Sequence, residues 1–331
     1  MNYIGSKHKL SKFIKSEIEK VAGQMKDKIF CDLFAGTGAI GRSFKTGSKK
    51  IIANDIEFYS YILNQNYIGN HEKLKYEKGL DELNSLAGAE GFIYKNYCAG
   101  GGSGRQYFSD ENGKKIDAIR QKIEVWKIGQ EINENQYYFL LTTLLENADA
   151  VANTASVYGA YLKHLKKSAQ KTLFLKPAFF DLNEATHEVY NEDANDLIKR
   201  IEGDVLYLDP PYNAREYGAN YHLLNTIALY DEFIPQGKTG LRKYNRSTYC
   251  KKREVGKVFD ELIKNADFKY VFLSYNNEGL MSKEFVQATM KKYGRYDSAT
   301  VEYQRFKADK TENRNHAAVG TIEYLHILEK S

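Results

Sequence analysis

The chain has 331 residues, of which 42% are hydrophobic, and a formal net charge of +5. This length and apolar content are enough for one large globular domain or two ordinary ones. No run approaches the roughly 18 apolar residues of a membrane helix, and the opening MNYIGSKHKL lacks the apolar core of a signal peptide. We therefore expect a cytoplasmic protein without membrane contact. The three scattered cysteines predict neither a disulfide framework nor a metal site.

The first 70 residues predict the alternating elements of a parallel sheet. Apolar residues at helical spacing cover 10–21. Two short apolar runs, IFCDLF and KKIIANDI, then flank AGTGAIGRSFK, which opens a helix. The order of strand, crossover helix and strand is the unit of a doubly wound α/β fold. The segment 56–68 is interpreted as the next helix.

Between residues 73 and 182 the pattern becomes mainly helical. The glycine-rich CAGGGSG at 98–104 predicts a loop, and apolar spacing predicts helices over 117–129 and 137–145. Beyond this segment VLYL and FKYVFLSYN predict strands, and TVEYQRF with GTIEYLHIL predicts a terminal antiparallel hairpin. We therefore expect a Rossmann-like, mostly parallel sheet formed by 1–72 and 183–331, with an inserted helical domain at 73–182.

A glycine loop follows the first predicted strand. DLFAGTGAIG contains Gly36, Gly38 and Gly41 in G-x-G-x-x-G spacing, and Asp55 lies 19 positions after Gly36. Such glycines allow close backbone approach to an adenosine-bearing cofactor, and the acid accepts from ribose hydroxyls. Asp32 before the turn would repel a pyrophosphate but could meet a cationic amino-acid group. This favours S-adenosylmethionine and leaves a nicotinamide dinucleotide as the alternative.

Two of the chain's 4 prolines stand together after the strand VLYL, in the sequence Asp209-Pro210-Pro211-Tyr212. Proline fixes its own φ and has no N–H, so the pair ends the strand abruptly. At the carboxyl end of a parallel strand, where ligands of such sheets bind, this stretch is expected beside the glycine loop. The competing interpretation is a rigid turn with a buried tyrosine.

The chain here resembles the N6-adenine DNA methyltransferases, whose hallmark D-P-P-Y stands unaltered. NYIGSK is similar to that family's opening cofactor motif, and DLFAGTG, NDI and NEDA are similar to its glycine loop, its ribose-binding acid and its adenine-contacting turn. The motif order is similar to the alpha group, which includes the Dam-like and FokI-type modification enzymes. The stretch 213–231 is close to the FokI-type continuation.

The resemblance implies a site-specific enzyme that transfers a methyl group from S-adenosylmethionine to N6 of a flipped adenine in duplex DNA. Asp209 and the Pro210 carbonyl would accept from the two N6 hydrogens, and Tyr212 would stack on the base. Tyr3 and Lys7 would contact the methionine part of the cofactor, Asp55 its ribose and Asp193 its adenine amine. A helix cap competes as the role of Asp193. The full set of expected cofactor residues is Tyr3, Lys7, Asp32, Phe34, Gly36, Gly38, Asp55, Ile56, Asp193 and Asp209.

The segment 238–257 carries eight basic residues against one acid, a charge of +7, so the rest of the chain is 5 − 7 = −2. Such a concentration interleaved with tyrosines is typical of a surface that binds a phosphate backbone. A solvated lysine-rich loop is the alternative. The expected DNA-binding residues are Lys238, Arg242, Lys243, Arg246, Lys251, Lys252 and Arg253. A weaker basic cluster lies in 161–171.

The sequence is also compatible with several other functions. RNA adenine methylation and cytosine-N4 methylation use the same amine chemistry, and a catalytically silent DNA-binding relative could keep the fold. Cytosine-C5 methylation is disfavoured because none of the three cysteines follows a proline as a loop nucleophile would. We expect no metal, a monomer or weak dimer, and a bacterial setting in which a cognate restriction endonuclease acts on the same DNA site.

Overall fold

The computed structural model describes residues 7–303 and 321–331, so the candidate cofactor residue Tyr3 lies outside the described part of the chain. The chain divides into two compact units. The described part of the sheet unit is 7–56, Asn183–Glu216, 245–303 and 321–331, and the helical unit is Glu57–Leu182 with Tyr217–Tyr244.

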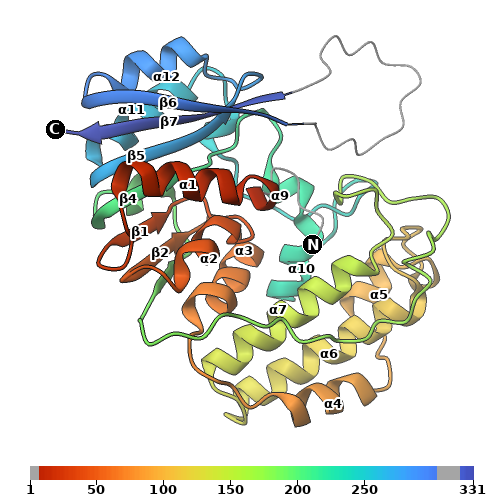
Figure 1. The fold of residues 1–331 in the computed structure, drawn as a ribbon. Coiled ribbons are helices and arrows are strands. Elements are labelled where there is room, and N and C mark those ends of the chain that lie inside the picture. Colours follow the sequence, from red (N-terminus) through yellow and green to blue (C-terminus); the bar gives the residue numbers. More distant parts are fainter. Residues whose placement is uncertain (1–6, 304–320) are drawn as a thin grey trace. The chain divides into compact units, whose positions relative to one another are not determined.

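The sheet unit is built on one seven-stranded sheet of order β3-β2-β1-β4-β5-β7-β6. All pairs from β3 through β5 are parallel, whereas β7 is antiparallel to both β5 and β6 (Figure 1). The predicted sheet and its terminal hairpin are therefore confirmed. The strands are β1 (Ile29–Asp32), β2 (Lys50–Asn54), β3 (Glu188–Tyr190), β4 (Glu202–Leu208), β5 (Asp267–Asn276), β6 (Gly294–Tyr303) and β7 (Thr321–Lys330).

Helices cover both faces of this sheet. On one face Phe30 of β1 stacks on Phe44 of α2 (Ala39–Lys45), with ring centroids 4.3 Å apart, and α1 (Ser11–Ala22) packs beside α2. On the other face Leu206 and Leu208 share a core with the remaining helices. These are α8 (Ala194–Leu197), α11 (Val255–Asn265) and α12 (Lys283–Met290), with the short turns η1 (Lys7–Lys9) and η4 (Thr248–Cys250) completing the unit.

The helical unit is larger than the predicted insert at 73–182. Leu141 of the insert shares one buried core with Ile62 from before it and with Leu224 and Ile227 from after it. The unit therefore includes 57–72 and 217–244 as well, because these segments bury their apolar faces there. Its elements are α3 (Phe58–Asn64), η2 (Gln65–Gly69), α4 (Glu77–Ser85), α5 (Phe92–Tyr97), η3 (Ala99–Gly101), α6 (Asp110–Ile128), α7 (Glu134–Ala150), α9 (Tyr217–Asn220) and α10 (His222–Leu229).

Capping residues explain why two helices begin earlier than apolar spacing predicts. The Ser109 side chain accepts from the Asn112 N–H, so α6 starts at Asp110. Asn133 and Gln136 form a reciprocal capping box, so α7 starts at Glu134. None of the helices in the described residues is long and apolar enough to cross a membrane.

The role of the capping box in stabilising the start of α7 can be tested by substitution. Asn133→Ala removes the acceptor for the Gln136 N–H and should lower the free energy of unfolding by about 1 kcal/mol. Asn133→Ser keeps a side-chain acceptor and should stay close to the wild type. Urea unfolding of the three proteins measures the difference, and equal losses in both variants would contradict the cap.

Candidate active site

The carboxyl ends of the parallel strands define one edge of the sheet. Asp32, the last residue of β1, pairs in register with Tyr207 of β4 and with Ala53 of β2. Because β7 is antiparallel, its first residues lie where β5 ends, and Glu323 pairs with Asn276. Residues that follow β1, β2 and β4 therefore meet the start of β7 at this edge.

The glycine loop after β1 is held by two carboxylates. Gly36 and Gly38 have φ values of 53° and 74°, which side chains rarely adopt, so glycine is required here. The Gly36 N–H donates to Asp55 Oδ2 at 2.8 Å, and the Gly41 N–H donates to Asp32 Oδ2 at 2.9 Å. Both carboxylates therefore fix the main chain of the glycine loop.

Asp32 is almost completely buried, with 1% of its surface exposed. Burial raises the pKa of its carboxyl to about 7. The Gly41 N–H opposes that rise, whereas Asp209 and Asp55 add to it. Its Oδ1 has no hydrogen-bond partner among the described residues. A buried carboxyl with an unsatisfied oxygen suits a cationic partner, as the amino-acid end of S-adenosylmethionine would provide.

The Asp209-Pro210-Pro211-Tyr212 stretch leaves the carboxyl end of β4 as predicted. The Asp209 side chain is 18% exposed, and Pro210 is buried. Within the described residues nothing donates a hydrogen bond to the Pro210 carbonyl. The Tyr212 carbonyl accepts from the Leu280 N–H at 2.9 Å, which ties the end of the stretch to the loop after β5.

A buried lysine joins Asp209 to a second carboxylate. Lys7 Nζ lies 3.1 Å from Asp209 Oδ1 and 2.9 Å from Glu323 Oε1, and both Lys7 and Glu323 are buried. The Ser274 hydroxyl of β5 donates to the same Glu323 oxygen at 2.5 Å. Two carboxylates therefore share one ammonium. We call Lys7, Asp209 and Glu323 the lysine cluster.

The lysine cluster perturbs the ionisation of its members. Burial raises the pKa of Asp209 to about 6, Lys7 opposes that rise, and Glu323 adds to it. Burial lowers the pKa of Lys7, but the two carboxylates outweigh burial and hold that pKa well above its ordinary value. Lys7 is therefore a permanent cation, while Asp209 changes charge within one or two pH units of neutrality.

The other expected cofactor residues lie around the same edge. Phe34 follows β1 and meets Tyr249 edge to face, with ring centroids 5.0 Å apart. Ile56 follows Asp55 after β2 and is partly exposed. Asp193 is exposed and caps α8, because its side chain accepts from the Asn195 N–H at 2.8 Å. The competing capping role is thus present, and a cofactor role for Asp193 stays a prediction.

Sequence reasoning missed Glu323, Ser274 and Tyr249. Glu323 interrupts the apolar side of GTIEYLHIL, since Leu325 and Ile327 on the same face are buried. An acid on the buried face of a strand was the available signal. Tyr249 lies inside the basic segment, yet it is buried and its hydroxyl donates to Asn195 at 2.8 Å. Ser274 carried no sequence signal.

The expected DNA-binding residues belong to both units. Arg242 in the helical unit is 10% exposed and forms two hydrogen bonds of 2.9 Å with Asp231, so its charge is already paired. In the sheet unit Lys251 lies 3.3 Å from Glu254 on the surface. The exposed members are Lys238 and Lys243 in the helical unit, and Arg246, Lys251, Lys252 and Arg253 in the sheet unit.

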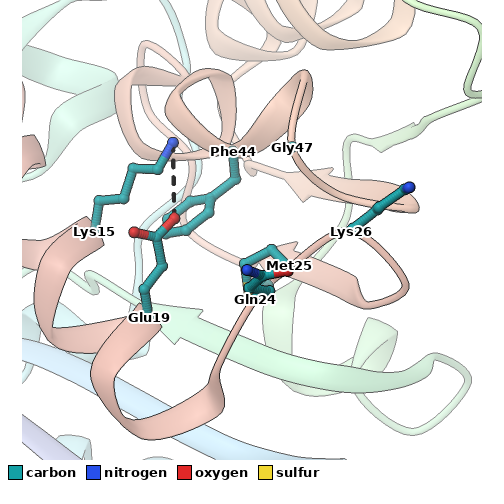
Figure 2. A pocket seen from close by; sticks show the side chains of 7 residues that line it. All are labelled: Lys15, Glu19, Gln24, Met25, Lys26, Phe44 and Gly47. Atoms are coloured by element: carbon teal, nitrogen blue, oxygen red, sulfur yellow. Dashed lines mark ion pairs between the residues drawn. The ribbon is translucent and has the colours of Figure 1, made fainter.

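A separate hollow of about 420 Å³ lies at the opposite edge of the sheet (Figure 2). Its lining comes from α1, from the segment that leads into β1 and from the end of α2. Lys15 and Glu19, one turn apart on α1, form a 4.0 Å ion pair on one side of it. Ligands of parallel α/β sheets bind at the carboxyl ends of the strands, so this hollow is not the expected substrate site.

Comparison with protein families matches residues 3–289 to the D12 class N6 adenine-specific DNA methyltransferases. The chain belongs to this family. The resemblance read from D-P-P-Y, the glycine loop and their order is confirmed. Membership makes the chain an adenine-specific DNA methyltransferase and implies S-adenosylmethionine as the methyl donor.

The chain is also similar to individual modification enzymes. It is 64% identical over 333 residues to Type II methyltransferase M.NlaIII of Neisseria lactamica. This match covers all of both chains. It is 38% identical to Type II methyltransferase M.FokI of Planomicrobium okeanokoites, covering all of this chain but 53% of that one. It is 38% identical to Type II methyltransferase M.CviAII of Paramecium bursaria Chlorella virus 1, covering 93% of each.

The raised pKa of Asp209 predicts a pH-dependent stability. Folding favours the neutral form of Asp209, so the protonated carboxyl adds to the free energy of unfolding at low pH. This contribution is lost as the pH rises through about 6. From about pH 4 to pH 8 the wild type should therefore lose about 2 kcal/mol relative to Asp209→Asn. Paired urea titrations measure this difference, and a difference that is constant with pH would contradict the burial of the charge.

Proposed function

We propose that this methyltransferase modifies N6 of an adenine extruded from duplex DNA, with Asp209, Pro210 and Tyr212 as the residues that handle the base. The single observation that carries the proposal is the arrangement at the end of β4, where a partly exposed carboxylate and a proline carbonyl follow one another beside the glycine loop.

Asp209 and Pro210 provide two hydrogen-bond acceptors for one amine. The lone pair of an exocyclic amine is delocalised into the ring, so the amine is a poor nucleophile. Acceptors aimed at both N6 hydrogens draw the nitrogen toward a tetrahedral state and free the lone pair. The Asp209 carboxylate accepts one hydrogen. The carbonyl of Pro210 accepts the other, and the stiff proline pair offers no N–H to compete.

S-adenosylmethionine, when bound, would supply an electrophilic methyl group on a sulfonium. The proton that N6 loses would pass along its hydrogen bond to the Asp209 carboxylate. The residues suited to hold it are those of the glycine loop and the adjoining strand ends. Asp32 supplies a buried acceptor for the cationic amino-acid end. The others are Phe34, Gly36, Gly38, Asp55, Ile56 and Asp193, with Tyr3 and Lys7 toward the methionine part.

Tyr212 offers an aromatic face for the extruded base. Its main chain is fixed by the Leu280 N–H, and its ring is partly buried against the core of the sheet unit. Stacking on such a ring is worth on the order of 1–3 kcal/mol and offsets part of the cost of unstacking the base from the duplex. A base inside the duplex would not reach the Asp209 carboxylate, so extrusion belongs to the proposal.

The exposed cations of 238–253 are proposed to contact DNA phosphates, and the helical insert at 73–182 to read the target sequence. Relatives named as Type II methyltransferases support a role as the modification enzyme of a bacterial restriction-modification system, acting in the cytoplasm beside an endonuclease of the same specificity. We retain the expectation of a monomer or weak dimer.

Methyl transfer itself tests the proposed chemistry. The purified protein should transfer labelled methyl from S-adenosylmethionine to N6 of adenine in duplex DNA. Asp209→Ala should lose transfer by at least about 100-fold because one of the two amine acceptors is removed, while its affinity for DNA is kept. Nucleoside analysis of the labelled DNA identifies the product. Label on cytosine, or full activity of the variant, would contradict the mechanism. Transfer of label to RNA but not to duplex DNA would identify RNA as the substrate.

The salt dependence of DNA binding tests whether the exposed cations of 238–253, here called the basic loop, contact phosphates. Replacing Lys251, Lys252 and Arg253 with alanine should reduce the slope of log affinity against log salt by up to about 3, since each phosphate contact contributes about 0.9. Lys26, Lys28 and Lys49 provide a matched control of equal charge at the opposite edge of the sheet. Fluorescence anisotropy with duplex DNA measures both slopes, and equal slopes in the two triple variants would remove the loop from the interface.

A further inference from the structure

Glu323 is a buried acid in the lysine cluster, although it lies outside the motifs that carry the family resemblance. It is 2% exposed, and its Oε1 accepts from both Lys7 and Ser274. Its Oε2 has no hydrogen-bond partner among the described residues. An ionised carboxylate is rarely buried unless it is paired, so the contact with Lys7 explains why this strand tolerates an acid on its buried face.

The geometry of the lysine cluster divides one positive charge between two carboxylates. Lys7 Nζ is 2.9 Å from Glu323 and 3.1 Å from Asp209, so neither carboxylate holds the ammonium alone. With both carboxylates ionised the cluster carries a net charge of −1. An ammonium that served Asp209 alone would neutralise it and weaken it as a hydrogen-bond acceptor, whereas a shared ammonium leaves negative charge on Asp209.

We propose that Glu323 is a positioning residue for the methyl transfer: it anchors Lys7 beside Asp209 and takes a share of the ammonium's charge, so that the ionised Asp209 stays a strong hydrogen-bond acceptor for the adenine amine. The inference rests on the proposed role of Asp209 as that acceptor. It adds a residue of the last strand to a site otherwise formed by the ends of β1, β2 and β4.

The groups that face Asp209 act in opposite directions. Burial raises its pKa most, Lys7 from the turn η1 lowers it, and Glu323 from β7 raises it. Among the described residues Asp32 of β1 and Tyr207 of β4 also interact with the charge of Asp209. Burial raises the pKa of both groups most, and the charge on Asp209 adds to the rise. Ser274 of β5 is uncharged and supports Glu323. Removing Glu323 or Lys7 should therefore move the ionisation of Asp209 in opposite directions.

The test is the pH profile of single-turnover methyl transfer to a duplex DNA substrate by the full chain. Glu323→Gln keeps the shape and can still accept from Ser274, but it removes a charge. Its acid limb should move to lower pH by about one unit, and its plateau rate should fall because Lys7 now pairs with Asp209 alone. Its dissociation constant for DNA should match that of the wild type.

Lys7→Met supplies the opposite perturbation. Without the ammonium the acid limb should move to higher pH by about one unit, since Glu323 and burial then act on Asp209 unopposed. Glu323→Asp restores the charge with a shorter side chain, and its acid limb should return toward that of the wild type. A purely structural role would lower the rate in each variant without moving the two limbs apart.

Two outcomes separate this inference from the proposed function. If Asp209→Ala transfers methyl at the wild-type rate, the acceptor role fails and the inference fails with it. If Asp209→Ala is inactive but Glu323→Gln keeps the wild-type acid limb and plateau, the acceptor role stands and the inference about Glu323 is overturned. Movement of the Glu323→Gln and Lys7→Met limbs in the same direction would also overturn it.

Discussion

The sharing of the Lys7 ammonium between Asp209 and Glu323 is the interaction on which the site depends. It joins the first described turn of the chain, the end of β4 and the start of the last strand at one edge of the sheet. Burying these charges separately would be costly, and pairing them makes the arrangement possible. Within it Lys7 lowers the pKa of Asp209 and so favours the ionised form, which is the form that the proposed acceptor role needs.

The topology of the sheet explains how such distant segments meet. Parallel strands bring the residues after β1, β2 and β4 to one edge, which gives the glycine loop, Asp55 and Asp209 a common location. The antiparallel direction of β7 then brings its first residues to that edge rather than to the opposite one. A parallel last strand would have carried Glu323 to the far end of the sheet, away from Lys7.

Sequence reasoning predicted the parts of the molecule that follow local patterns. The glycine loop, the strand before Asp209 and the terminal hairpin all have short-range signatures, and the structure confirms them. It failed where a contact joins residues far apart in the chain. No local sequence pattern predicts the contact between Lys7 and Glu323. No pattern in 217–244 predicts that α10 completes the core of the helical unit. The early starts of α6 and α7 depend on caps that apolar spacing does not detect.

The ionisation of Asp209 is the quantity that tests this account most directly. The carboxyl carbon of Asp209, observed by NMR in protein labelled at aspartate and assigned with Asp209→Asn, reports its charge as the pH changes. The account predicts a midpoint near 6 in the wild type, and a lower midpoint in Glu323→Gln. A midpoint near the ordinary aspartate value of 3.8, unchanged by the loss of Glu323, would contradict it.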